Sequence, residues 1–276
     1  MASPPQCGAR WGRILRPPAG SSAENMKEGL GMRVVHDTHV GAVRKANEDA
    51  CKGGQLPGDG AWAVVCDGMG GANGGSVASA LALERIEEYL AKNFREGLSG
   101  GSMKSLLLNA LRWANDGVYK LSLERPELRG MGTTAVVMAA AGGVLHVVHV
   151  GDSRAYIRNK CGLTQITEDH SYVQDLVNFG QITREQARRH PRRNIITRVL
   201  GVHETVRPDY TFCNFRPGDI ALACSDGLSN YVDDALMEAY LEKYAADSQE
   251  LLRQFIQYAL DCGGSDNITA ALIFAD

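Results

Sequence analysis

The sequence predicts an α+β protein in which helices cover a sandwich of strands, and three features carry this prediction. Two long stretches with a helical spacing of apolar residues lie between residues 73 and 123. A cluster of short β-rich runs begins near residue 132. Two more helical stretches and one apolar run complete the chain. Helices and strands grouped in this way predict an α+β sandwich with its helices on the outside.

Composition indicates a globular chain and excludes several classes of protein. With 276 residues, 44% of them hydrophobic, the sequence is best explained by one large domain, with or without a tail. A net charge of -3 gives no reason to expect a nucleic-acid partner or an anionic membrane surface. No apolar run approaches the roughly 18 residues of a membrane span. The 7 cysteines include no C-x-x-C pair, so we expect a cytoplasmic protein without disulfides. We also expect a monomer.

Residues 1–31 differ from the rest of the chain. They are rich in Pro, Gly and Ser, and their apolar residues show no period. The apolar stretch Trp11 to Leu15 is too short and too interrupted for a signal peptide. We therefore expect a disordered tail, or a start assigned too early with Met26 or Met32 as the true beginning, followed by one folded domain over residues 32–276.

The first half of the domain is expected to contain two strands and two helices. Residues 32–43 and 61–67 have strand-like patterns, and the glycine-containing stretch 53–60 between them is expected to be a turn-rich connection. One helical pattern begins at Asn73, and a second runs over residues 102–123. The apolar stripes of both helices predict core packing and say nothing about function.

The second half is expected to alternate between strands and a polar insertion. Residues 169–202 are polar, contain a basic run near Pro191, and have short helical patterns at 172–179 and 183–189. Two longer helical patterns lie at 233–244 and 248–261. The expected strands are 133–140, 144–150, 153–158, 163–167, 205–212, 219–224 and 267–274.

Three acidic residues lie at strand ends and carry the chemical prediction. Asp67 follows an apolar run and precedes Gly68, Asp226 has the same surroundings, and Asp266 precedes the last apolar run. Each Asp alone is better explained by an ordinary turn. Carboxylates that converge in one core would repel each other and raise each other's pKa values, unless a divalent cation removes the repulsion. The three together therefore predict a metal site.

Oxygen ligands without His or Cys favour a hard cation such as Mg²⁺ or Mn²⁺. No zinc spacing such as H-E-x-x-H is present, and the glycines after Asp67 lack the G-K-[ST] ending of a nucleotide loop. Two metals about 3.5–4 Å apart would lower the pKa of a water and aim it at phosphorus. We expect Asp67 to bridge the metals, the Gly68 carbonyl to be a further ligand, and Arg44 to contact phosphate oxygens in a bidentate manner.

Six short motifs in order resemble the bacterial branch of the metal-dependent type 2C protein serine/threonine phosphatases. The resemblance covers residues 32–276 and implies a four-layer α-β-β-α sandwich of two antiparallel sheets flanked by helices. The motifs are Arg44-x-x-Asn47-Glu48-Asp49, Asp67-Gly68-Met69-Gly70-Gly71, Gly130-Met131-Gly132-Thr133-Thr134, Val150-Gly151-Asp152-Ser153-Arg154, Ser225-Asp226-Gly227-Leu228 and Ser265-Asp266-Asn267.

The resemblance also implies roles for individual residues. Asp226 and Asp266 would complete the shell of the first metal, and Glu48 or Asp49 would act at the second, directly or through water. Asp152, together with Asp226, would form a third, weaker metal site. Asn267 would support the ligand before it. The segment 169–202 occupies the place of the family's flap, beside the cleft, and its basic run is expected to be a solvated face rather than a contact for phosphoprotein.

The resemblance implies hydrolysis of phosphoserine and phosphothreonine on proteins by water activated at a binuclear Mn²⁺ or Mg²⁺ centre. The expected partners are phosphorylated proteins, including an opposing bacterial serine/threonine kinase and its substrates. One departure is Met69, where animal and plant members carry a proton-donating His, so the general acid is unassigned. Two alternatives stay open: a hydrolase of small phosphoesters, and a catalytically silent phosphoprotein-binding module.

Overall fold

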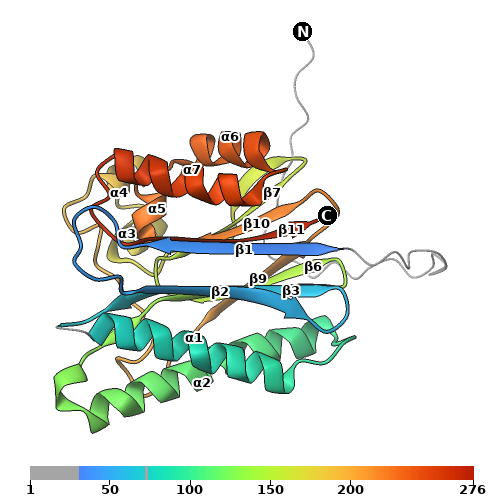
Figure 1. Ribbon diagram of the computed structural model, residues 1–276. Coiled ribbons are helices and arrows are strands. Elements are labelled where there is room, and N and C mark those ends of the chain that lie inside the picture. The colour runs from blue at the N-terminus through green and yellow to red at the C-terminus, as the bar shows by residue number, and fades with distance from the viewer. Residues whose placement is uncertain (1–30, 72–73) are drawn as a thin grey trace.

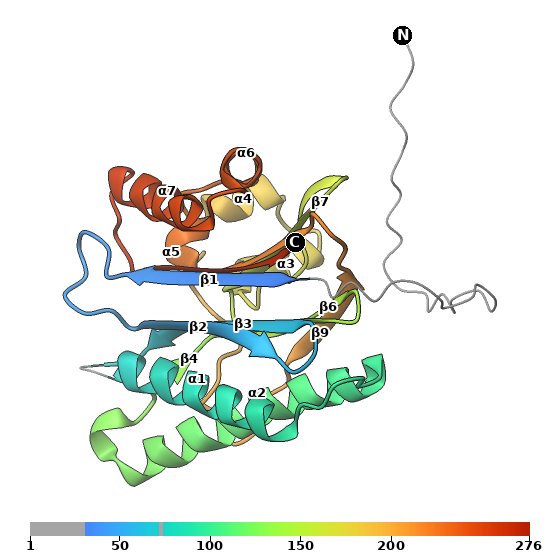
Figure 2. The same ribbon diagram turned by 45° about the vertical axis from the view of Figure 1, so that its right-hand side comes forward.

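The computed structural model describes residues 31–71 and 74–276 and has the predicted four layers (Figure 1). Two antiparallel sheets lie face to face, a pair of long helices covers one of them, and a second pair covers the other (Figures 1 and 2). The expected tail falls almost entirely on residues 1–30 and so lies outside the described residues. Within the described ranges, no helix combines the length and apolarity needed to cross a bilayer.

The first sheet joins the two ends of the domain. Its five strands follow the spatial order β1-β11-β10-β7-β8, and every neighbouring pair is antiparallel. The first and last strands of the chain therefore pair along their full length, from Met32 opposite Ala275 to His39 opposite Ile268. The strand bounds are β1 Met32–His39, β7 Arg154–Asn159, β8 Gly162–Gln165, β10 Ile220–Cys224 and β11 Ile268–Ala275.

The second sheet has the order β2-β3-β5-β6-β9, with the short strand β4 paired to the end of β3. The strands β3 and β5 are buried on both faces, which is why their sequences are almost continuously apolar. The strand bounds are β2 Asp49–Leu56, β3 Gly60–Met69, β4 Gly132–Thr133, β5 Ala135–Ala141, β6 Val144–Val150 and β9 Asp209–Asn214.

The helices form the two outer layers and one end of the domain. The long helices α1 and α2 cover the six-stranded sheet, and α6 and α7 cover the five-stranded sheet (Figure 1). Ser99 caps α2 by accepting a hydrogen bond from the Ser102 amide, as N-cap serines commonly do. The helix bounds are α1 Gly74–Asn93, α2 Gly100–Glu124, the 3₁₀ turn η1 Pro126–Leu128, α3 Tyr172–Asn178, α4 Arg184–Arg188, α5 Asp226–Ser229, α6 Asp234–Tyr244 and α7 Ser248–Asp261.

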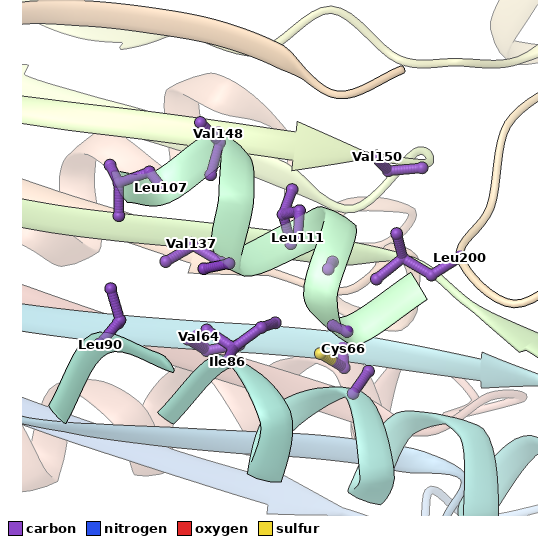
Figure 3. Packing of buried hydrophobic residues seen from close by; sticks show 14 of the residues in the cluster. Val64, Cys66, Ile86, Leu90, Leu107, Leu111, Val137, Val148, Val150 and Leu200 are labelled. Carbon is purple, nitrogen blue, oxygen red and sulfur yellow. The ribbon is translucent and has the colours of Figure 1, made fainter. Parts of the chain in front are cut away.

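Three apolar clusters hold the four layers together, one at each interface between layers. In the cluster beneath α1 and α2, Ile86 and Leu111 point onto the sheet, where Val64, Val137 and Val148 meet them (Figure 3). Each fully buried side chain of this size contributes about 1.5–3 kcal/mol relative to an exposed one. The middle cluster between the sheets consists mainly of Ala and Val, and such small side chains let the sheets approach closely.

The structure corrects the sequence predictions at four places. The stretch expected to be a turn-rich connection contains the second half of β2, whose Gly53 and Gly54 pair with Ala63 and Trp62. The first strand ends at His39 instead of continuing to residue 43. The strand expected at 205–212 runs over Asp209–Asn214, and α5 was not predicted. Glycine lowers strand propensity without preventing strand pairing, so the tertiary context of β2 determined that this segment is a strand.

Candidate metal centre

The acidic residues singled out in the sequence lie at one end of the sandwich. The loop 40–48 between β1 and β2 and the short helix α5 lie at this end, on the left in Figures 1 and 2. Asp67 is near the end of β3, Asp49 begins β2, and Asp226 begins α5. The topology therefore brings residues from distant parts of the chain to one end.

Asp49 is buried and reaches from one sheet to the other. Its Oδ2 accepts hydrogen bonds from Ser225 Oγ at 2.8 Å and from Thr269 Oγ1 at 2.6 Å. Ser225 directly follows β10 and Thr269 lies in β11, so both hydroxyls come from the five-stranded sheet. Its strand partner across the β2–β3 pair is Asp67. The sequence analysis did not single out Ser225 or Thr269 as site residues, although their positions beside Asp226 and after Asn267 are the only signal that could have found them.

The backbone of Asp67 is fixed by Thr133 and Thr134, which belong to one of the six sequence motifs. The Asp67 amide donates to Thr134 Oγ1 at 3.0 Å, and its carbonyl accepts from Thr133 Oγ1 at 2.9 Å and from the Thr134 amide at 2.8 Å. Thr134 also shares a hydrogen bond with Ser153 at 2.7 Å. Thr133 and Thr134 therefore hold a candidate ligand in place instead of contacting substrate.

Burial and mutual repulsion perturb the carboxylates of this end. Burial, followed by the charges of Asp49, Asp226, Asp152 and Asp266, raises the pKa of Asp67 well above its ordinary value. Burial raises the pKa of Asp49 to about 7, opposed by its two hydroxyl donors. Carboxylates that disfavour their own ionisation in this way form a site that a cation would stabilise.

Asp152 and Asp226 form a second part of the same acidic group. Burial, and then the charge of Asp226, raises the pKa of Asp152 to about 7. Asp152 Oδ1 is buried and has no hydrogen-bond partner. Burial and then Asp266 raise the pKa of Asp226, whose Oδ2 accepts a hydrogen bond from Asn230 at 3.1 Å. An unpartnered buried carboxylate oxygen costs free energy that a ligand could recover.

Arg44 and Asp266 form an ion pair at the rim of the site, with 2.8 Å between Arg44 Nη2 and Asp266 Oδ2. Both side chains are partly exposed, at 50% and 36% of their surface. The hydrogen bond and charge of Asp266 raise the pKa of Arg44. The arginine is therefore a fixed cation beside the carboxylates, where phosphate oxygens could replace Asp266.

Asn267 clamps the loop that carries Arg44 and Glu48. Its side-chain amide donates to the Val40 and Ala46 carbonyls at 2.9 and 3.0 Å, and its Oδ1 accepts from the Glu48 amide at 2.8 Å. Its own amide donates to Asp266 Oδ1 at 2.9 Å. The contact to Asp266 agrees with the expected support of the preceding residue, and the loop contacts were not predicted.

Two glycines let the chain pack closely around the acidic residues. A Cβ on Gly68 would collide with the carbonyl oxygens of Gly75 and Glu48. A Cβ on Gly227 would collide with the carbonyl oxygen of Asn267. The glycines that follow Asp67 and Asp226 therefore allow the backbone to approach closely.

The residues present fit hard divalent cations by their chemistry. All the candidate side-chain donors are carboxylates, which Mg²⁺ and Mn²⁺ prefer. In the described ranges, no three His, Cys, Asp or Glu side chains form a ready-made ligand cluster. When no cation neutralises the carboxylates, they repel one another, and this opposes such a cluster. The ion pair of Asp266 with Arg44 opposes it as well. The raised pKa values and the unpartnered Asp152 oxygen are the structural evidence that a cation fits here.

Comparison with known proteins agrees with this fold. The family model described as Protein phosphatase 2C matches residues 39–272. The serine/threonine protein phosphatase PstP of Mycobacterium tuberculosis is 39% identical over 88% of this chain. The chain spans 45% of the length of that relative. The serine/threonine phosphatase stp of Listeria monocytogenes is 36% identical, with 89% of this chain and 96% of the relative covered.

Solved structures give the same result. A crystal structure of the M. tuberculosis phosphatase PstP/Ppp superposes with a TM-score of 0.79 and 36% identity, covering 90% of this chain and 100% of that one. A structure of the catalytic domain of PstP in complex with two manganese ions gives a TM-score of 0.77 at 35% identity, covering 88% and 97%. The chain belongs to the protein phosphatase 2C family, and residues 39–272 form a phosphatase domain of that family.

Proposed function

We propose that the protein is a metal-dependent protein phosphatase that hydrolyses phosphoserine and phosphothreonine in other proteins. The observation that carries the proposal is the group of buried carboxylates with raised pKa values beside the cation of Arg44. Family membership and the manganese complex of a relative support the same reaction class. The chain contributes both a place for cations and a place for a phosphoryl group.

The proposed ligands divide among two principal cation sites and a third, weaker one. Asp67 would be shared by the first two, with the Gly68 carbonyl as a further ligand of the second. Glu48 or Asp49 would serve the second site, and Asp152 would join Asp226 at the third. Asp226 and Asp266 would complete the first. We propose Mn²⁺ or Mg²⁺ as the occupant, because these ions take oxygen ligands and retain water. When bound, the cations would supply a water of lowered pKa and neutralise developing charge.

The chain's own side chains would bind and orient the phosphoryl group. Arg44 presents a planar guanidinium that can donate two parallel hydrogen bonds to phosphate oxygens. Its partner Asp266 is a proposed ligand, so release of Asp266 to a cation would free Arg44 for substrate. Met69 is 39% exposed and carries no transferable proton, so the leaving oxygen takes its proton from another group. Asn267 keeps Arg44 and Glu48 on one rigid loop.

We infer that the substrates are phosphorylated proteins, including a serine/threonine kinase and the proteins it modifies. We place the protein in the cytoplasm as a monomer. Cys66 and Cys224 support a reducing compartment because they are buried thiols without disulfides, and burial raises their pKa values. Neither thiol is proposed to act as a nucleophile.

The function is tested by turnover of phosphoserine, phosphothreonine and phosphotyrosine peptides, with Mn²⁺, Mg²⁺ or a chelator. We expect turnover of the first two peptides, its loss on chelation, and its loss in Asp67→Asn. The exposed turn residue Asp59 provides a matched control, and Asp59→Asn is expected to keep wild-type turnover. Preference for sugar phosphates or nucleotides would instead identify a small-phosphoester hydrolase. Binding of phosphopeptides without turnover in any metal would identify a silent binding module.

A further inference from the structure

A cavity of about 740 Å³ extends from the acidic residues of the metal centre toward the segment 169–202. Asp152 and Asp226 line it at the metal centre, and α4 lines it on the other side. The start of α6, with Asp233 and Asp234, forms a further wall. Ligand-binding cavities commonly have volumes of about 300–1,000 Å³, so this one could hold several groups of a substrate in addition to a phosphoryl group.

The wall formed by α4 carries positive charge that the protein does not neutralise. Arg184 and Arg188 are four residues apart on one helix and therefore share a face, and both line the cavity. In the described part of the chain, neither guanidinium has a carboxylate partner. By contrast, Arg189, the C-cap residue of this helix, pairs with Glu185 at 3.1 Å and does not line the cavity.

The position of α4 is fixed by local hydrogen bonds. Thr183 and Gln186 form a reciprocal capping box at its start. At its end, Arg193 Nη1 donates to the Arg188 carbonyl at 3.2 Å. The base of the segment is closed by the Tyr172 amide, which donates to the Ile195 carbonyl at 2.9 Å. The two arginines are thus presented by an ordered element.

We propose that the cavity wall formed by Arg184 and Arg188 is a subsite for an anionic group on the substrate chain, close in sequence to the residue that is dephosphorylated. The inference rests on the proposed phosphatase function and adds a substrate class to it. Asp152 and Asp226 are proposed ligands that also line this cavity, so substrate residues next to a phosphoryl group held at the metal centre would lie in it. Carboxylate and phosphoryl groups both match guanidinium geometry. The other acidic residues that line the cavity repel an anion and leave the two arginines of α4 as its contact; they are Glu168, Asp169, Asp233 and Asp234.

The test compares phosphothreonine peptides that share one sequence and differ at a single flanking position. That position carries Ala, Glu or a non-hydrolysable phosphonate analogue of phosphoserine, and it is moved along both sides of the phosphothreonine. With Mn²⁺ present, we expect kcat/KM to rise about tenfold for an anion at a preferred position, mainly through a lower KM. A larger gain for the phosphonate than for Glu assigns the subsite to a second phosphoryl group, and equal gains assign it to any anion.

The variant R184Q/R188Q is expected to lose this preference, so that its kcat/KM values for the Ala and anionic peptides become equal. R189Q is the matched control, because this arginine caps the C-terminus of the same helix but lies outside the cavity, and the variant is expected to keep the preference. Circular dichroism and thermal unfolding show whether each variant is folded. Wild-type protein without any preference, or R184Q/R188Q with the wild-type preference, would overturn the proposal.

A failure of the subsite can be separated from a failure of the proposed function. If no phosphopeptide is hydrolysed in Mn²⁺ or Mg²⁺, the phosphatase function fails and the subsite is judged by binding alone. Fluorescence anisotropy of the same labelled peptides with Mn²⁺-loaded wild-type protein then provides the readout. Tighter binding of the anionic peptides that R184Q/R188Q abolishes and R189Q retains would support the subsite, and equal binding of all peptides would refute it.

Discussion

Asp49 and Asp67 lie directly opposite each other on the antiparallel strands β2 and β3. Asp49 is buried and Asp67 is partly buried, and burial together with neighbouring acidic groups raises both pKa values. Like charges on opposed strand positions destabilise a sheet. The register of this strand pair therefore holds the protein in an electrostatically unfavourable state that binding of cations would relieve.

The first prediction concerns the pH dependence of stability without metal. Asp49 has a folded-state pKa of about 7 against an ordinary value of 3.8, so between these values the folded state holds a proton that the unfolded state has lost. Stability from this group therefore falls as pH rises through this window and levels off above about pH 7. In the presence of chelator, the unfolding free energy of the wild-type protein is expected to fall between about pH 5.5 and 7.5. We expect this fall to be about 2 kcal/mol smaller in Asp49→Asn.

Urea titrations of both proteins at each pH measure this difference. Asp59→Asn, at an exposed turn, serves as the control and is expected to follow the wild-type pH dependence. Added Mn²⁺ should stabilise wild-type protein more at the higher pH, because cations compete with protons for the carboxylates. Parallel pH profiles for wild type and Asp49→Asn would contradict the raised pKa of this carboxyl.

The relationship between Asp49 and Asp67 also shows what the sequence could and could not predict. The apolar run before Asp67 predicted its strand, because burial on both faces leaves a direct hydrophobic signal. The second half of the strand that Asp49 begins was expected to be a turn-rich connection, because Gly53 and Gly54 lack side chains that would favour a strand. This strand forms because it pairs with β3, and a local sequence pattern does not reveal such a pairing. Motif order identified Asp49 as a candidate ligand even though its strand was missed.

Other features of the site could not be predicted for a similar reason. The hydroxyls of Ser225 and Thr269 reach Asp49 from segments far away in the sequence. Asn267 was expected to support Asp266, but its contacts with the loop 40–48 appear only when β1 and β11 pair. The acidic residues could be predicted because strand-end carboxylates are chemically unusual, whereas their hydrogen-bond donors are ordinary polar residues.

The second prediction separates the binding role of Arg44 from its structural role. The Arg44–Asp266 ion pair is largely exposed, and such pairs contribute at most about 1 kcal/mol to stability. We expect Arg44→Ala to change the unfolding free energy by less than about 1 kcal/mol and to lower kcat/KM for a phosphopeptide about a hundredfold. Arg44→Lys should recover only part of this loss because it cannot donate in a bidentate manner. Steady-state kinetics and urea unfolding give both values, and a large stability loss with intact kcat/KM would contradict the assignment.

The third prediction concerns close packing at α5. An added Cβ at Gly227 would collide with the Asn267 carbonyl oxygen, which lies in the backbone between the proposed ligand Asp266 and β11. We expect Gly227→Ala to destabilise the protein by at least about 2 kcal/mol and to weaken Mn²⁺ binding, because Asp226 and Asp266 flank the contact. Gly71→Ala is the control, since an added Cβ there meets nothing within 4 Å. Thermal unfolding and Mn²⁺ calorimetry measure the effects, and equal behaviour of the two variants would show that the backbone can move apart.

The last prediction concerns the turn that carries Asp152. The buried ring of His170 accepts a hydrogen bond at Nδ1 from the Gly151 amide at 3.0 Å, and its Nε2 lies 3.2 Å from Asp209 Oδ2. Burial lowers the pKa of His170 to about 4, so the ring is neutral and donates to Asp209. His170→Ala would leave the Gly151 amide buried without a partner, which costs about 1–3 kcal/mol of stability.

Because Gly151 directly precedes Asp152, the same change is expected to raise the Mn²⁺ concentration needed for half-maximal activity, while kcat at saturating Mn²⁺ changes less. His203→Ala, at an exposed position, should alter stability by no more than about 0.5 kcal/mol and leave the Mn²⁺ dependence as in wild type. Urea unfolding and activity titrations with Mn²⁺ measure the two effects separately. A loss of stability in His170→Ala with an unchanged Mn²⁺ dependence would mean that the histidine supports the fold without positioning Asp152.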